Sequence, residues 1–74
     1  MNLKELRITK GISPSFVAHI IGVTYRHFNR IERKGMYLNK EREKKLSIIY
    51  STTIENIKEC AKESKKLWVK MKLN

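Results

Sequence analysis

The segment from Ser13 to Arg33 has the capping residues and the spacing of two short helices joined by a tight turn at Gly22. Ser13, which precedes Pro14, and Thr24 can each cap a helix, because a side-chain hydroxyl accepts a hydrogen bond from an unpaired amide of the first turn. Glycine suits the turn because it adopts the left-handed conformation that a Cβ atom opposes. The segment therefore predicts a helix, a reversal of the chain and a second helix.

An apolar contact across the cap is predicted at the start of both helices. Ile12 and Val17 lie on either side of the first cap at the spacing of a hydrophobic staple. Val23 and Phe28 repeat this spacing around the cap at Thr24. The residues that the helical period turns towards a core are Val17, Ala18, Ile21, Phe28 and Ile31.

Three more helices are expected outside this segment, which gives an all-α fold. The first starts at Asn2, with Glu5 placed to complete a capping box, and Gly11 ends it. Residues 33–39 lose the helical period and include a glycine, so they predict a loop. A fourth helix follows, and its apolar stripe comprises Leu46, Ile49 and Tyr50.

The last helix is expected to begin at Thr52 or Thr53, with Glu55 able to complete a capping box. Along it, apolar and small residues recur at alternating steps of three and four, the spacing of a heptad seam. We divide the chain into a compact five-helix domain over 1–58 and a basic helical extension over 59–74, because the first turns of this helix suffice to close the core. The residues of the possible dimer seam are Ile57, Ala61, Ser64, Trp68 and Met71.

The sequence leaves open what covers this seam. Pairing with a second copy in a homodimer is slightly favoured, and a different protein partner is an alternative. The seam can also wrap back over its own domain, or the helix can fray from about Ser64. Ala61 and Ser64 within so few heptads make a weak seam on its own, whereas the size of Trp68 favours burial.

The balance of charge indicates a polyanionic partner. The chain has 17 Lys and Arg residues against 7 Asp and Glu, a net charge of +10. Nucleic acid is the leading candidate, and a Lys-rich surface that only maintains solubility is the plainer alternative. A single domain of 74 residues buries only about 60% of its unfolded surface, so a deep catalytic cleft is not expected.

The residues that most often carry catalysis or bind metals are not clustered. Cys60 is the single cysteine and cannot form an internal disulfide, and His19 and His27 lie on different helices with no third ligand near them in sequence. Ser13 and Thr24 read as helix caps without an accompanying base, so we expect no enzyme, no metal and no cofactor. With no apolar run of roughly 20 residues and no signal peptide, we expect a cytoplasmic protein that does not enter a membrane.

Four strings have the order and spacing of a known family: Leu3-Lys4-Glu5-Leu6-Arg7, Lys10-Gly11-Ile12-Ser13, Ile21-Gly22-Val23-Thr24 and Arg30-Ile31-Glu32-Arg33. Together they resemble the Cro/C1-type (XRE-like, lambda-repressor-like) helix-turn-helix family of phage and bacterial repressors, over roughly residues 2–58. The resemblance implies a five-helix domain whose third helix lies in the major groove of double-stranded DNA, usually as a dimer on a two-fold operator. It implies a repressor-like regulator of transcription that acts by occupying DNA.

Carried over residue by residue, the resemblance assigns three sets of residues. The candidates for base contacts on the recognition helix are Tyr25, Arg26, His27, Asn29 and Arg30. The candidates for phosphate contacts are Ser13, Thr24, Arg33, Lys34, Asn39 and Lys40. Arg7 and Glu32 match a structural ion pair between the first helix and the end of the third.

Two departures from the family separate this chain from its relatives. Pro14 stands where relatives often carry a glutamine that contacts phosphate, and residues 25–28 are bulky where small polar residues are common, so no base preference carries over. The alternative function is a protein-interaction module, such as an antirepressor or adaptor, that keeps this fold and uses its C-terminal helix. An RNA-binding domain is less favoured, because a helix fits the major groove of B-form DNA and not the deep groove of A-form RNA.

Overall fold

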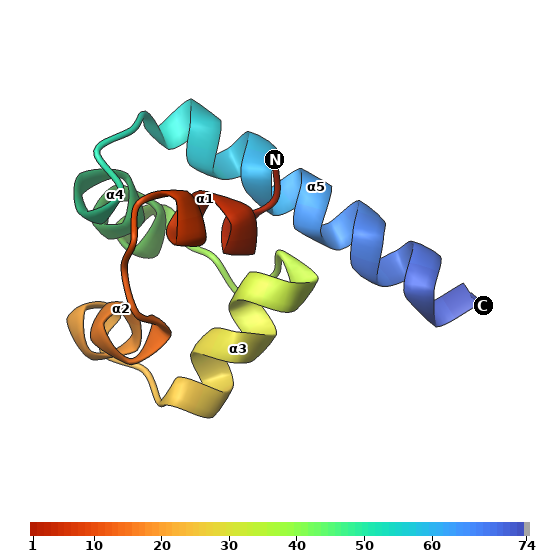
Figure 1. Cartoon of the computed structure of the whole chain (residues 1–74), viewed down its shortest axis with the longest axis horizontal. Coiled ribbons are helices and arrows are strands. Elements are labelled where there is room, and N and C mark those ends of the chain that lie inside the picture. Colours follow the sequence, from red (N-terminus) through yellow and green to blue (C-terminus); the bar gives the residue numbers. More distant parts are fainter. Residues whose placement is uncertain (74) are drawn as a thin grey trace.

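The computed structural model describes residues 1–73, and over these residues it consists of five helices joined by short connections (Figure 1). Their order is α1 (Leu3–Thr9), α2 (Pro14–Ile21), α3 (Tyr25–Lys34), α4 (Lys40–Ile49) and α5 (Ile54–Leu73). The prediction of an all-α five-helix domain is confirmed. The C-terminal part of α5 runs out beyond the other helices, as expected of an extended last helix (Figure 1).

Side-chain caps define where the first four helices begin. The oxygens of Asn2, Ser13, Thr24 and Asn39 each accept a hydrogen bond from the backbone amide three residues further along. At α1 the Glu5 carboxylate also accepts from the Asn2 amide at 2.9 Å, which completes the predicted capping box. The starts of α1, α2 and α3 therefore have the predicted physical cause, whereas the cap of α4 at Asn39 was not predicted.

The start of α5 differs from the prediction in one detail. Thr53 Oγ1 accepts from the Asn56 amide at 3.0 Å, and the Asn56 side chain donates to Thr52 Oγ1 at 2.9 Å. With Thr53 as the cap, the third helical position is Asn56 rather than Glu55. The predicted capping box with Glu55 is therefore wrong, because Asn56 occupies the third helical position, where the motif requires Glu or Gln.

All five helices contribute to one hydrophobic core. The five residues of α2 and α3 that the helical period turned inward are all buried. Cys60 of α5 is also part of the core, and its burial raises the pKa of its thiol, so little reactive thiolate forms near neutral pH. The buried apolar residues are Leu3, Leu6, Val17, Ala18, Ile21, Phe28, Ile31, Leu46, Tyr50, Ile57, Cys60 and Ala61.

The end of α3 passes very close to α5. Gly35 follows α3 with a φ of +64°, and its amide donates to the Ile31 carbonyl at 2.8 Å. A Cβ atom at this position would overlap the backbone carbonyl oxygen of Ala61 in α5. The absence of a side chain at Gly35 therefore sets how near the two helices approach.

Replacing Gly35 by alanine is expected to destabilise the domain more than the same change at Gly22. Gly22 also has a positive φ, of +74°, but a Cβ there meets nothing within 4 Å. We expect Gly22→Ala to lower the free energy of unfolding by about 1–2 kcal/mol, through the left-handed backbone alone. Gly35→Ala should cost about 1–3 kcal/mol more, because α3 and α5 must move apart.

Urea denaturation followed by far-ultraviolet circular dichroism measures both glycine variants. Equal losses of stability at Gly35 and Gly22 would contradict the close contact between α3 and α5.

Candidate nucleic-acid interface

The turn between α2 and α3 has the geometry that its residues predict. Gly22 ends α2 in the left-handed conformation, and the Val23 amide donates to the Ala18 carbonyl at 3.0 Å. Thr24 Oγ1 then accepts from the His27 amide at 3.1 Å and starts α3. Hydrogen bonds therefore hold both ends of this turn, and they fix the direction in which α3 leaves α2.

Helix α3 has one buried face and one exposed face. Phe28 and Ile31 lie in the core, with 2% and 0% of their surface exposed. Arg26, Arg30 and Arg33 are exposed, and their spacing of four and three residues places them in one row along the helix. The apolar face anchors the helix, and the opposite face presents three guanidinium groups to solvent.

The other predicted base contacts flank this arginine row. Tyr25 and Asn29 are exposed on the side that faces α1 and the end of α5. His27 is half-buried, and its ring packs against the Tyr37 ring at a centroid distance of 5.7 Å. Of the five candidates, Tyr25, Arg26, Asn29 and Arg30 are therefore exposed, whereas His27 is partly engaged by the loop after α3.

Two residues that hold this loop were not singled out from the sequence. Tyr37 has a φ of 63°, which is uncommon for a residue other than glycine. Arg42 of α4 donates from Nη1 to the Tyr37 carbonyl at 2.7 Å and so fixes the loop beside the first turn of α3. The available signal was an aromatic residue in a short basic loop, but no periodic pattern predicts its left-handed backbone.

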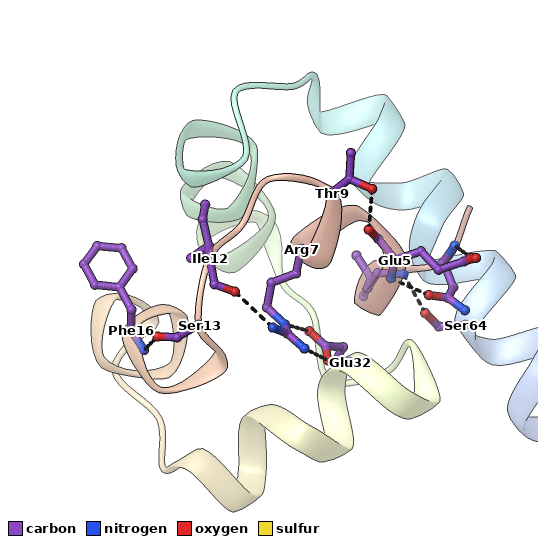
Figure 2. A network of polar contacts seen from close by, with 10 residues as sticks. Glu5, Arg7, Thr9, Ile12, Ser13, Phe16, Glu32 and Ser64 are labelled. Carbon is purple, nitrogen blue, oxygen red and sulfur yellow. Dashed lines mark hydrogen bonds and ion pairs between the residues drawn. The ribbon is translucent and has the colours of Figure 1, made fainter.

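The ion pair between Arg7 and Glu32 connects α1 to α3. Arg7 Nε donates to Glu32 Oε2 at 2.8 Å, and Arg7 Nη2 donates to Glu32 Oε1 at 3.2 Å. The third nitrogen, Nη1, donates to the Ile12 carbonyl at 3.0 Å (Figure 2). The hydrogen bonds to Glu32, together with its negative charge, raise the pKa of the Arg7 guanidinium. The predicted structural pair is thus present, and one guanidinium also holds the connection between α1 and α2.

Four of the predicted phosphate contacts lie at helix starts. Ser13 and Thr24 are exposed, and each hydroxyl oxygen accepts a hydrogen bond from a backbone amide. The hydroxyl hydrogen remains able to donate to an anion. Asn39 caps α4, with its side-chain oxygen accepting from the Arg42 amide at 2.8 Å. Lys40 follows as the exposed first residue of that helix.

Arg33 and Lys34, at the end of α3, have different surroundings. Arg33 belongs to the exposed arginine row. Lys34 is half-buried, and its ammonium group lies 5.0 Å from the centroid of the Trp68 ring in α5. Lys34 is thus engaged in a cation–π contact with the C-terminal helix, and Arg33 is the better placed of the two for a phosphate.

Most of the predicted dimer seam lies inside the domain. Ile57 and Ala61 are core residues, exposed by 0% and 7%. Ser64 is 2% exposed, and its Oγ accepts from the Leu3 amide at 3.0 Å (Figure 2). The prediction that these three residues contact a second copy is wrong, because their own domain already covers them. Trp68 is half-buried and Met71 is exposed, and both line a cleft between α5 and α3.

Residues 1–73 contain no group of three or more His, Cys, Asp or Glu side chains arranged to hold a metal ion. None of the helices in the described part of the chain has both the length and the hydrophobicity needed to cross a membrane. Comparison with protein-family models, with curated proteins and with solved structures gives no match. The chemistry of the chain's own surface, above all the arginine row on α3, is therefore the guide to what it binds.

Replacing Arg7 by methionine is expected to destabilise the domain strongly. The carboxylate of Glu32, 6% exposed in the pair, would remain buried without its partner, which costs about 3–5 kcal/mol. The matched control is Lys45→Met, which breaks the exposed pair between Lys45 and Glu41 and should cost no more than about 1 kcal/mol.

The double variant Arg7→Met with Glu32→Leu should recover part of the lost stability, since no charge is then left unpaired. Chemical denaturation of the three variants measures these differences. If Arg7→Met were no worse than Lys45→Met, the ion pair would not be what joins α1 to α3.

Proposed function

We propose that the chain is a sequence-specific, repressor-like regulator of transcription that binds double-stranded DNA with α3 in the major groove, in the manner of the Cro/C1-type family that its sequence resembles. The row of Arg26, Arg30 and Arg33 on a helix anchored in the core is the observation that carries this proposal. The major groove of B-form DNA admits one α-helix and carries base edges that guanidinium groups recognise. A rigid helix with an exposed basic face suits that groove in both shape and charge.

The exposed side chains of α3 offer the groups that base edges require. The guanidinium of Arg26 or Arg30 can bind O6 and N7 of guanine through two parallel hydrogen bonds. The amide of Asn29 matches N6 and N7 of adenine, and Tyr25 offers a ring to a thymine methyl group or a hydroxyl to a phosphate. Each good bidentate pair contributes about 1–3 kcal/mol of discrimination between bases.

Contacts to phosphates would fix the register of α3 in the groove. Ser13 and Thr24 lie at helix N-termini, where free amides and the helix dipole favour an anion. Arg33 and Lys40 add two further exposed positive charges. The net charge of +10 supplies the sequence-independent attraction to DNA that weakens as salt is added.

Such a domain regulates by occupying DNA and needs no chemical step. We propose that it acts in the cytoplasm. A helix held in the major groove competes for the site with any other protein that reads the same bases. Control would then come from the concentration of the protein or from a partner that changes how much of it is free to bind.

The Arg26→Ala variant tests the proposed base contacts. Selection from a random pool of double-stranded DNA is expected to enrich a motif that contains guanine. On that motif, Arg26→Ala should lose about 5- to 150-fold in affinity, equivalent to about 1–3 kcal/mol, while unrelated DNA is bound almost as before. Competition titrations at one salt concentration measure the ratio.

The control for Arg26→Ala is Lys44→Ala, which removes the same charge from an exposed position on α4 and should keep the preference for the selected motif. A selection that enriches no motif at any ionic strength, or an Arg26→Ala variant with unchanged preference, would overturn the proposed function.

The Lys40→Ala variant tests the proposed phosphate contacts. It should weaken binding to all sequences alike and reduce the slope of log affinity against log salt by about one unit. Lys34→Ala serves as the comparison, because the ammonium of Lys34 lies over Trp68 and its removal should leave the slope near that of the unmodified protein. Titrations at several salt concentrations give the slopes, and a decrease for Lys34→Ala without one for Lys40→Ala would contradict this assignment.

A further inference from the structure

A cleft of about 440 Å³ lies between the C-terminal part of α5 and the helices α1 and α3. The α5 side of the cleft is formed by the buried Ser64 and by an apolar wall of Leu67, Trp68 and Met71. Leu67 is 48% exposed and Met71 is 64% exposed, so the domain leaves much of this wall open to solvent. Tyr25 and Asn29 of α3 form the opposite wall.

Positive charge surrounds this apolar wall. The carboxylate of Glu32, which also lines the cleft, is neutralised by its ion pair with Arg7. The ammonium groups of Lys34 and Lys72 each lie 5.0 Å from the centroid of the Trp68 ring, so a carboxylate that approaches this ring meets two positive charges. The basic residues at the cleft or over its tryptophan are Lys4, Arg33, Lys34 and Lys72.

We propose that this cleft binds an acidic amphipathic segment of a partner protein. The apolar side chains of the segment pack on Leu67, Trp68 and Met71, and its carboxylates face the basic residues around that wall. Complementary charge steers such a segment to the cleft, and the desolvated tryptophan supplies the anchor that dominates many interfaces.

A second copy of this chain fits the cleft poorly. Each copy carries a net charge of +10. The apolar end of α5 that a second copy would insert has Lys70 and Lys72 beside Met71, so it would bring positive charge to a positive border. Duplex DNA does not match the α5 wall of the cleft either, because Leu67 and Met71 offer a phosphate no hydrogen bond.

Binding in the cleft also regulates the DNA-binding face, an inference that rests on the proposed function. Tyr25, Asn29 and Arg33 line the cleft and also belong to that face. A segment that occupies the cleft covers these side chains on one flank of α3. The partner and DNA therefore exclude one another, and an acidic segment releases the protein from its site.

The single tryptophan of the chain reports on the cleft directly, since Trp68 is part of its wall. The probe is a synthetic helical peptide without tryptophan that has leucines on one face and glutamates on the other. A shuffled peptide of the same composition, whose leucines share no face, separates docking from general attraction to a basic protein. We expect a saturable change in Trp68 fluorescence with the first peptide and at least tenfold weaker binding of the second.

Paired substitutions on α5 locate the bound peptide. Leu67→Glu places a negative charge in the cleft and should weaken binding at least tenfold. Val69→Glu adds the same charge two residues away on another face of the helix, at a side chain of similar exposure, 40% against 48%, and should change affinity less than threefold. Met71→Glu, at a still more exposed position, replaces Leu67→Glu if circular dichroism shows that variant to be misfolded.

Three results would overturn docking in the cleft. These are equal binding of the ordered and shuffled peptides, equal effects of Leu67→Glu and Val69→Glu, or no change in Trp68 fluorescence with any peptide. A concentration-dependent dimer in sedimentation velocity that Leu67→Glu abolishes would instead identify a second copy as the occupant.

The regulatory step is measured separately with a labelled duplex of selected sequence. The ordered peptide should displace the protein from DNA at concentrations that fill the cleft, and it should fail to displace the Leu67→Glu variant at the same concentrations. A ternary complex of peptide, protein and DNA would overturn mutual exclusion. If the protein bound the peptide but enriched no DNA motif, the proposed function would fail while docking in the cleft stood.

Discussion

The ion pair between Arg7 and Glu32 is the contact on which the placement of the candidate interface on α3 depends. Two buried charges are costly to bring together, and they are stable only when their geometry and hydrogen bonding are nearly complete. Here both carboxylate oxygens are used, and the remaining guanidinium nitrogen binds the Ile12 carbonyl. Apolar contacts have no comparable directional preference. This pair therefore fixes the orientation of α1 relative to α3, and relative to the start of α2, more tightly than packing alone.

Helix α3 is consequently held along its whole length. Its first turn follows the closed turn at Gly22 and the cap at Thr24, its apolar face lies in the core, and its last turn is tied by Glu32. Gly35 then brings it against α5. A binding helix that is already ordered loses little conformational freedom when it meets its target, so more of the contact energy is available for discrimination.

The parts of this structure that local chemistry decides could be predicted from the sequence. Caps at Ser13 and Thr24 and the turn at Gly22 depend on single side chains, and the inward faces of α2 and α3 follow from the helical period. The pairing of Arg7 with Glu32 came from family resemblance rather than from spacing. The left-handed backbone of Tyr37 followed from no pattern, because the contacts that accompany it are made with other elements: a ring contact with His27 of α3 and a hydrogen bond from Arg42 of α4.

The seam on α5 shows the limit of periodicity most clearly. A spacing of three and four residues says that one face of a helix is apolar, but not which surface covers it. In α5 one face of the helix has two different surroundings: Ile57 and Ala61 are buried in the core, whereas Met71 is exposed in the cleft. Predicting the division required knowing where α1 and α3 end in space.

One continuous helix thus connects the core of the domain to the cleft. The 20 residues of α5 begin in the core and continue past it without a break, so the position of the C-terminal part follows from the packing of the N-terminal part. The contact of Gly35 with Ala61 sets the separation of α3 and α5 where they meet, and the contact of Lys34 with Trp68 holds that separation about two turns further along α5. The width of the cleft and the orientation of the arginine row therefore have a common origin. A change in the packing of α3 against α5 alters both at once, which is the physical condition for a ligand in the cleft to influence binding by α3.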